Sequence, residues 1–286
     1  MRFIVVTGKG GVGKTTVSAI LGLSISSKSK TVIYDQSENG SLFEVFKKDF
    51  ITYKYQSITD SMKIFHIDWV KGAVEYSKLK FKFLLWLPFV KSSLFKSFSR
   101  AVPGFRETIV LGKIWYDGVK GRYDTAILDS PPTGQVINLL RIPEAIKDAK
   151  ITGIIKNDVE GMYSMTKNCE IVLVTIPEEL PIEETIEFIE SAKSKGYKIS
   201  CIVLNRYFSE RLSEQTQDWI RKYIVESEKS REMNSVFSLY SSLSEDSDYY
   251  LSILSSTGYK VVTIPMNFFG VDMKFLKEMA NRFEDY

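Results

Sequence analysis

A glycine-rich run near the start of the chain has the residue types and the spacing of a loop that binds phosphate. Gly8 is followed, after four residues, by Gly13, Lys14 and Thr15. Glycines allow backbone N–H groups to approach phosphate oxygens, and the amino end of a following helix favours negative charge. Lys14 would neutralise the β- and γ-phosphates of a nucleotide, and the Thr15 hydroxyl would bind Mg²⁺. The run therefore predicts a site for ATP and Mg²⁺.

The expected nucleotide contacts cover the whole loop and one residue beyond it. They are Gly8, Lys9, Gly10, Gly11, Val12, Gly13, Lys14, Thr15 and Thr16. Thr16 is expected at the α-phosphate. The alternative is a plain glycine turn in front of a helix. An apolar strand over Phe3–Thr7 and a helical pattern over Thr15–Ser27 give the loop the context that phosphate binding requires, and they favour the functional interpretation.

Further along the chain, short β-branched runs alternate with helical patterns. Most of these runs lack strict polar alternation, which is typical of strands that helices cover on both faces of a parallel sheet. They are Thr31–Asp35, Tyr123–Asp129, Ile171–Ile176, Ile199–Asn205 and Lys260–Pro265. A helical pattern also covers Ile182–Lys195. The alternation predicts an α/β fold with a doubly wound, mainly parallel sheet.

Two segments are too long to be simple crossovers between strands. Residues 42–122 are rich in large apolar side chains, and we expect them to form a helical insertion subdomain. Residues 207–258 are polar, with a helical pattern near 218–225 and serine runs between 238 and 244 that we expect in loops. No clear linker interrupts the chain, so residues 1–286 are expected to form one domain with two insertions.

Composition restricts the function classes. The net charge of +3 is too small to indicate a nucleic-acid partner. Cys169 and Cys201 lie far apart in sequence, which suggests buried thiols in a reducing compartment rather than a disulfide framework. The first residues lack the apolar core of a signal peptide, and no apolar run is long enough to cross a membrane. A cytoplasmic location is therefore expected.

Two aspartates end predicted strands, and one histidine stands apart from them. Asp35 and Asp129 would lie at the carboxyl edge of a parallel sheet, beside the phosphates. Carboxylates there can hold a Mg²⁺-bound water or orient an attacking water. The single histidine, His66, cannot form a metal cluster alone, and a structural or surface role is expected for it.

Lys9 narrows the class of nucleotide-binding protein. The run Gly8-Lys9-Gly10-Gly11-Val12-Gly13-Lys14-Thr15-Thr16 resembles the deviant Walker A motif of the class that contains ArsA, MinD, ParA and the nitrogenase iron protein. In that class the extra lysine reaches the nucleotide of the partner subunit. The resemblance implies a homodimer with ATP at its interface, in which Lys9 and Lys14 both stabilise charge during hydrolysis.

Four further segments resemble ArsA-type ATPases, in the same order along the chain. They are Asp129-Ser130-Pro131-Pro132-Thr133-Gly134-Gln135 with the following Leu139–Pro143, and residues 101–107, 177–185 and 203–205. That family includes arsenite-pump ATPases and the targeting ATPases of tail-anchored membrane proteins. The resemblance covers most of the chain.

The resemblance implies roles for six residues outside the loop. Asp35 would position the attacking water, Asn39 would sense the nucleotide, and Asp129 would hold Mg²⁺ through water. The Thr133-Gly134 backbone would follow the γ-phosphate, and the Asn205 amide would contact adenine, although a turn asparagine is the alternative there. Gln36 and Glu38 stand where the family has proline and histidine, which weakens the assignment of Asp35 and Asn39.

The client of such an ATPase is less well defined. Residues 78–100 combine apolar side chains at near-helical spacing with several lysines. They could form a groove for an apolar helix or a membrane-associated partner, or they could be the core of the insertion. Two cysteines cannot build the thiolate cluster of an arsenite pump, nor the zinc site that many targeting members have. The alternatives are a MinD- or ParA-like positioning ATPase on membrane or DNA, and an ATP-dependent ligase or kinase.

Overall fold

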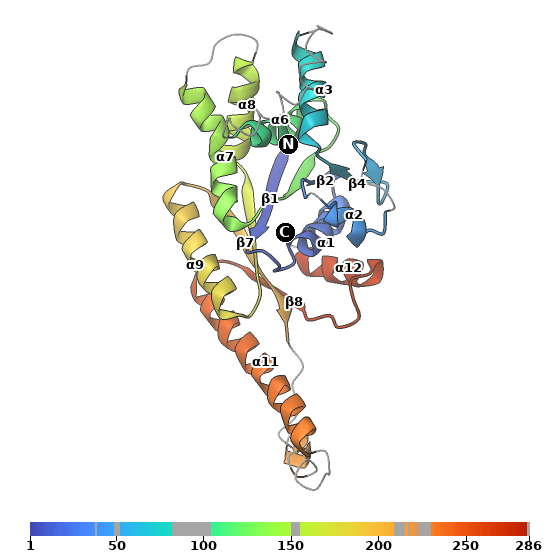
Figure 1. Ribbon diagram of the computed structural model, residues 1–286, viewed down its shortest axis with the longest axis vertical. Helices are drawn as coiled ribbons and strands as arrows, with labels where there is room; N and C mark the ends of the chain where they lie inside the picture. Colours follow the sequence, from blue (N-terminus) through green and yellow to red (C-terminus); the bar gives the residue numbers. More distant parts are fainter. Residues whose placement is uncertain are drawn as a thin grey trace.

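The computed structural model describes residues 1–37, 39–48, 52–81, 104–149, 155–208, 215–216, 218–220, 222 and 230–284. Within these ranges eight strands form one sheet in the order β3-β4-β2-β5-β1-β6-β7-β8. Every neighbouring pair is parallel except β3 and β4. The predicted α/β fold with a mainly parallel sheet is confirmed (Figure 1).

The predicted strands are all present, with ends within two residues of the expected ones, and two further strands, β3 and β4, join them. The strands are β1 (Arg2–Gly8), β2 (Thr31–Asp35), β3 (Gln56–Ser57), β4 (Met62–His66), β5 (Thr125–Asp129), β6 (Glu170–Thr175), β7 (Lys198–Tyr207) and β8 (Val261–Pro265). The central strands β1, β2 and β5 are almost entirely buried, which explains why their sequences lack alternation.

Helices cover both faces of this sheet. They are α1 (Lys14–Ser26), α2 (Ser41–Val45), α3 (Trp69–Phe81), α6 (Phe105–Val119), α7 (Thr133–Asp148), α8 (Lys156–Lys167), α9 (Glu179–Ser194), α11 (Ser230–Ser256), α12 (Met273–Ala280) and the short 3₁₀ helix η2 (Asn281–Phe283). Helix α1 follows the glycine-rich loop as predicted, and α9 begins three residues earlier than its apolar pattern indicates.

The two faces of the sheet have separate cores, because successive strand residues point to opposite sides. In β1, Phe3 and Val5 pack with α6, α7, α8 and α9. Ile4 and Val6 of the same strand pack with α1, α2 and α12. The sheet is thus doubly wound, and the carboxyl ends of its parallel strands meet at one edge.

The segment 42–122 differs from the expected helical insertion, because it contributes the short strand β3 and the strand β4 to the sheet. Residues 62–66 form β4, which pairs in parallel with β2 and extends the main sheet. Met62, Ile64 and Phe65 are buried, so this short apolar run behaves as a sheet strand rather than part of a helix. Residues 82–103 lie outside the described residues, so the insertion subdomain and most of the predicted client face stay predictions.

The serine runs between 238 and 244 were expected in loops, and this prediction was wrong. They lie within α11, a helix of 27 residues that extends well beyond the sheet in Figure 1. Ser252, Ser255 and Ser256 of this helix donate hydrogen bonds to carbonyls three or four residues earlier. Such bonds let serine remain in a helix despite its preference for turns.

Candidate active site

The glycine-rich loop runs from the end of β1 to the start of α1, and two of its glycines are required by the geometry. A side chain on Gly8 would collide with the Val174 carbonyl of the neighbouring strand β6. Gly13 has a φ of 92°, in the left-handed region, and a side chain there would collide with the Asn205 amide. The backbone of the loop is thereby fixed between β6, β7 and α1.

Lys14 lies at the first position of α1, and its side chain turns back across the loop. Its ammonium nitrogen donates to the Gly8 carbonyl at 3.2 Å and to the Lys9 carbonyl at 3.0 Å. Burial lowers the pKa of Lys14, while the carboxylates of Asp129 and Glu184 oppose this change. The loop therefore surrounds a cation, as phosphate binding requires.

Thr15 and Asp129 meet directly, although they lie on different elements. The Thr15 hydroxyl donates to Asp129 Oδ2 at 2.7 Å, and the Ser18 hydroxyl donates to Oδ1 at 3.2 Å. Asp129 ends β5 next to β1 and is nearly inaccessible. Burial raises the pKa of Asp129 to about 6, although the Thr15 hydrogen bond acts in the other direction. Ser18, one helical turn after Thr15, is a partner that the sequence reasoning missed.

Asn205 and Arg206 join the end of β7 to the loop. The Asn205 amide nitrogen donates to the Val12 carbonyl at 2.8 Å, and the Arg206 guanidinium donates to the Gly11 carbonyl at 3.1 Å. Arg206 has a φ of 56°, which is unfavourable for a residue other than glycine, at a register shift between β7 and β8. Arg206 was not identified from the sequence, because only this local bend turns it toward the loop.

Asp35 ends β2 directly beside Asp129, in register across the sheet. Its carboxylate is fully buried and accepts backbone N–H groups from Ser37 at 2.7 Å and from Leu42 at 3.4 Å. His66 ends β4, and its Nδ1 lies 3.9 Å from Asp35 Oδ2. Asp35 therefore organises the segment that leads into α2. His66 therefore lies at the same edge of the sheet as Asp35. The sequence did not indicate this, because His66 is far from the other candidate residues along the chain.

Glu184 of α9 connects the two segments that would face a terminal phosphate. Its Oε1 accepts a hydrogen bond from the Thr133 hydroxyl, at the start of α7. Its Oε2 lies 3.8 Å from the Lys9 ammonium nitrogen. The sequence reasoning included Glu184 in a family-like segment without giving it a role. Its position becomes significant only because α9 follows β6, the strand beside the loop.

The structure brings most of the predicted residues to one edge of the sheet. Gly8 through Thr15 surround the start of α1, and Asp35, Asp129, Thr133 and Asn205 adjoin it through the contacts above. Thr16 follows on the first turn of α1, and Gly134 is exposed on the first turn of α7. Asn39 is exposed on the loop before α2, and nothing in the described contacts links it to the glycine-rich loop.

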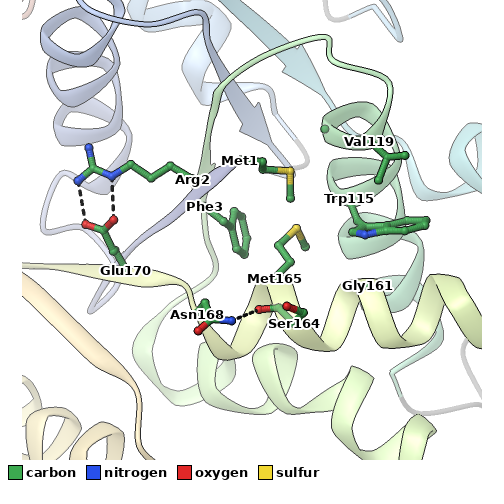
Figure 2. A pocket seen from close by; sticks show the side chains of 11 residues that line it. Met1, Arg2, Phe3, Trp115, Val119, Gly161, Ser164, Met165, Asn168 and Glu170 are labelled. Carbon is green, nitrogen blue, oxygen red and sulfur yellow. Dashed lines mark hydrogen bonds and ion pairs between the residues drawn. The ribbon is translucent and has the colours of Figure 1, made fainter.

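A cavity of about 570 Å³ lies at the opposite edge, where the strands begin. Phe3, Trp115 and Met165 are among the residues that line it, as are Arg2 and Glu170, which form an ion pair (Figure 2). Arg2 starts β1 and Glu170 starts β6, whereas the glycine-rich loop follows the end of β1. The cavity is therefore not part of the candidate nucleotide site.

Comparison with known proteins identifies the family to which this site belongs. The profile of the anion-transporting ATPases, the ArsA family, matches residues 1–171. This chain belongs to that family. The match covers the loop, both strand-end aspartates and the start of α7, so the resemblance inferred from the motifs is confirmed. ATP hydrolysis is the activity that the family membership establishes.

Individual ArsA-family relatives are distant. The chain is 25% identical over 230 residues to ATPase BagA of Mycobacterium tuberculosis, which covers 75% of this chain and 68% of that protein. It is 25% identical to a protein of Aquifex aeolicus named as an arsenical pump-driving ATPase, over 80% of this chain and 86% of the relative. A protein named ATPase ASNA1 homolog from Plasmodium yoelii yoelii is 25% identical over 72% of this chain and 62% of its own length.

Proposed function

We propose that this ArsA-family ATPase works as a nucleotide-switched homodimer that binds ATP between its subunits. The observation that carries the proposal is the position of Lys9. Its side chain lies in the glycine-rich loop, at the edge of the sheet where the parallel strands end, and is about one third exposed. The Lys9 ammonium nitrogen lies 3.8 Å from Glu184 Oε2. The pair is exposed and long, so a phosphate group that takes the place of Glu184 frees Lys9 at small cost. Lys9 would then reach the nucleotide of the second subunit.

Within each subunit the remaining residues take distinct roles. Lys14 neutralises the β- and γ-phosphates, and the loop amides and Thr16 bind the other phosphate oxygens. Asp35 positions the attacking water from the neighbouring strand end. Thr133 and Gly134 follow the γ-phosphate, Asn205 contacts adenine, and Asn39 senses the bound nucleotide. Asn205 is well placed for this role, since it is already bonded to the loop.

The oxygen atoms of Thr15 in α1 and Asp129 at the end of β5 fit Mg²⁺. Thr15 and Asp129 bring a hydroxyl and a carboxylate oxygen within 2.7 Å of each other, and Mg²⁺ prefers oxygen ligands. Thr15 would bind the ion directly and Asp129 through water. When bound, the ion neutralises charge on the β- and γ-phosphates. The Thr15–Asp129 contact keeps both oxygens oriented toward the loop.

We further propose that the client is the apolar helix of a membrane protein, as in the targeting branch of the family. A relative named as an ASNA1 homolog supports this proposal. The described start of the predicted client face, residues 78–100, carries the exposed Leu79 at the end of α3. None of the helices in the described part of the chain has the length and apolar character needed to cross a bilayer. The buried thiols of Cys169 and Cys201 suit action in the cytoplasm.

The dimer is tested by the mass of the protein in solution. We expect sedimentation analysis to show a shift from monomer to dimer with ATP and Mg²⁺, in the slowly hydrolysing Asp35→Asn background. Lys9→Ala should prevent the shift, whereas Lys30→Ala, an exposed lysine before β2 at the opposite edge, should preserve it. A dimer that forms equally well without ATP, or without Lys9, would refute the switch.

The client is tested with a tail-anchor peptide and the same nucleotide states. We expect the peptide to bind in ATP and to be released in ADP. Parallel co-sedimentation with liposomes and with DNA addresses the positioning alternative. ATP-dependent binding to liposomes or DNA without peptide binding would replace the targeting role by a positioning role.

A further inference from the structure

Glu184 contacts two groups that a terminal phosphate would also need. The Thr133 hydroxyl donates to one of its carboxylate oxygens, and the Lys9 ammonium lies 3.8 Å from the other. Thr133 opens α7, 51 residues before Glu184 in sequence. Lys9 belongs to the glycine-rich loop. One carboxylate thus links the loop to the segment that follows Asp129.

The chemistry of these contacts matches that of a phosphoryl group. A carboxylate and a terminal phosphate both offer anionic oxygens to hydroxyl donors and ammonium groups. The same carboxylate also acts on Lys14. The negative charge of Glu184 raises the pKa of Lys14, although burial lowers that pKa by more. Glu184 is about one third exposed, so water and nucleotide can reach it.

We propose that Glu184 is a specificity-determining residue that competes with the γ-phosphate of ATP for Lys9 and Thr133. ADP leaves both contacts intact, whereas ATP displaces the carboxylate and frees Lys9 for the partner subunit. Glu184 thereby sets the ratio of ATP to ADP affinity and keeps Lys9 within its own subunit until ATP binds. The second part rests on the proposed dimer. The affinity ratio does not, because it applies to a single chain.

The alternative is an ordinary surface ion pair that contributes little. The Thr133 contact argues against it, because it adds a second contact to the same carboxylate, from a buried hydroxyl group. Glu183 provides the matched comparison. It precedes Glu184 on α9, has the same side chain and is exposed. A general effect of negative charge on α9 would appear in both residues, whereas competition with phosphate would appear only in Glu184.

The test measures ATP and ADP dissociation constants for wild type, Glu184→Gln and Glu183→Gln, at protein concentrations where the chain is monomeric. The glutamine keeps the shape and can still accept from Thr133, so the fold should persist. We expect Glu184→Gln to tighten ATP about fivefold and ADP less than about twofold, the size expected for one removed charge in a partly screened site. Glu183→Gln should change neither constant by as much as about twofold.

A double-mutant cycle identifies the partner of the charge. In a Lys9→Met background, Glu184→Gln should tighten ATP less than it does in wild type, because the competition for Lys9 is gone. Equal tightening of ATP and ADP, or weaker binding of both, would overturn the proposal. An altered affinity ratio without ATP-driven dimerisation would keep the role of Glu184 and remove the dimer. ATP-driven dimerisation with an unchanged ratio of ATP to ADP affinity would keep the dimer and remove the role of Glu184.

Discussion

We expect the charge of Asp129 to destabilise the fold while it serves the proposed binding of Mg²⁺, and a single substitution tests this. Its carboxylate is buried at the end of β5, and burial raises its pKa from 3.8 to about 6. A pKa difference of one unit corresponds to about 1.4 kcal/mol, so the charged form costs the folded protein about 3 kcal/mol at neutral pH. Asp129→Asn removes this charge while keeping the size and shape of the side chain.

The substitution also removes part of the hydrogen bonding. The Thr15 and Ser18 hydroxyls donate to different carboxylate oxygens, and an asparagine offers one acceptor oxygen. The pKa of about 6 already includes the effect of both bonds, so the cost of the charge sets an upper limit on the gain in stability. We therefore expect Asp129→Asn to stabilise the protein by about 1 to 2 kcal/mol at pH 7.5, without nucleotide or Mg²⁺. Mg²⁺-dependent ATP hydrolysis should be largely lost.

The pH dependence gives the sharper criterion. Between pH 4 and 6 folded Asp129 retains a proton that the unfolded chain has largely released, so the wild-type protein gains stability as the pH falls through this range. The advantage of Asp129→Asn should therefore shrink from pH 7.5 to pH 4.5. Urea unfolding followed by tryptophan fluorescence measures it, and about 1.5 kcal/mol corresponds to a midpoint shift of roughly 0.5 M.

The control is Asp60→Asn, an exposed aspartate in the turn before β4. It should show no comparable change of its stability difference with pH. A stability difference between Asp129→Asn and wild type that is the same at both pH values would refute the explanation by burial. So would a variant that is less stable than wild type at pH 7.5.

Two further predictions concern strand-end side chains. Asp35→Asn should slow hydrolysis by about a hundredfold while ATP affinity stays within about threefold, and full turnover in a phosphate-release assay would remove Asp35 from the mechanism. Asn205→Ala removes the donor to the Val12 carbonyl and should weaken ATP binding about tenfold by calorimetry, with a loss of about 1 kcal/mol of stability. The control is Asn168→Ala, which should leave ATP affinity unchanged. The Asn168 side chain lies directly after α8 and donates to the Ser164 carbonyl of that helix.

Local sequence was enough to predict the phosphate-binding loop of the candidate site. Gly8, Gly13, Lys14 and Thr15 are adjacent or nearly so, and their conformation depends on the strand and helix on either side of them. Asp35 and Asp129 could also be assigned, because a parallel sheet places its strand ends at one edge. The buried strands were recognisable because a strand covered on both faces must be apolar along its length.

Only the tertiary structure decided which distant side chains meet the loop. The tertiary structure brings Glu184 to Thr133, Arg206 to Gly11 and His66 to Asp35. These contacts depend on the positions of α9, the end of β7 and β4 in and beside the sheet. Strand order is a long-range property, and hydrophobic periodicity does not encode it. The same limitation applies to β4, whose short apolar run becomes a strand only by pairing with β2. The sequence predicted a phosphate-binding loop, and the packing of the sheet determined which carboxylate stands beside that loop.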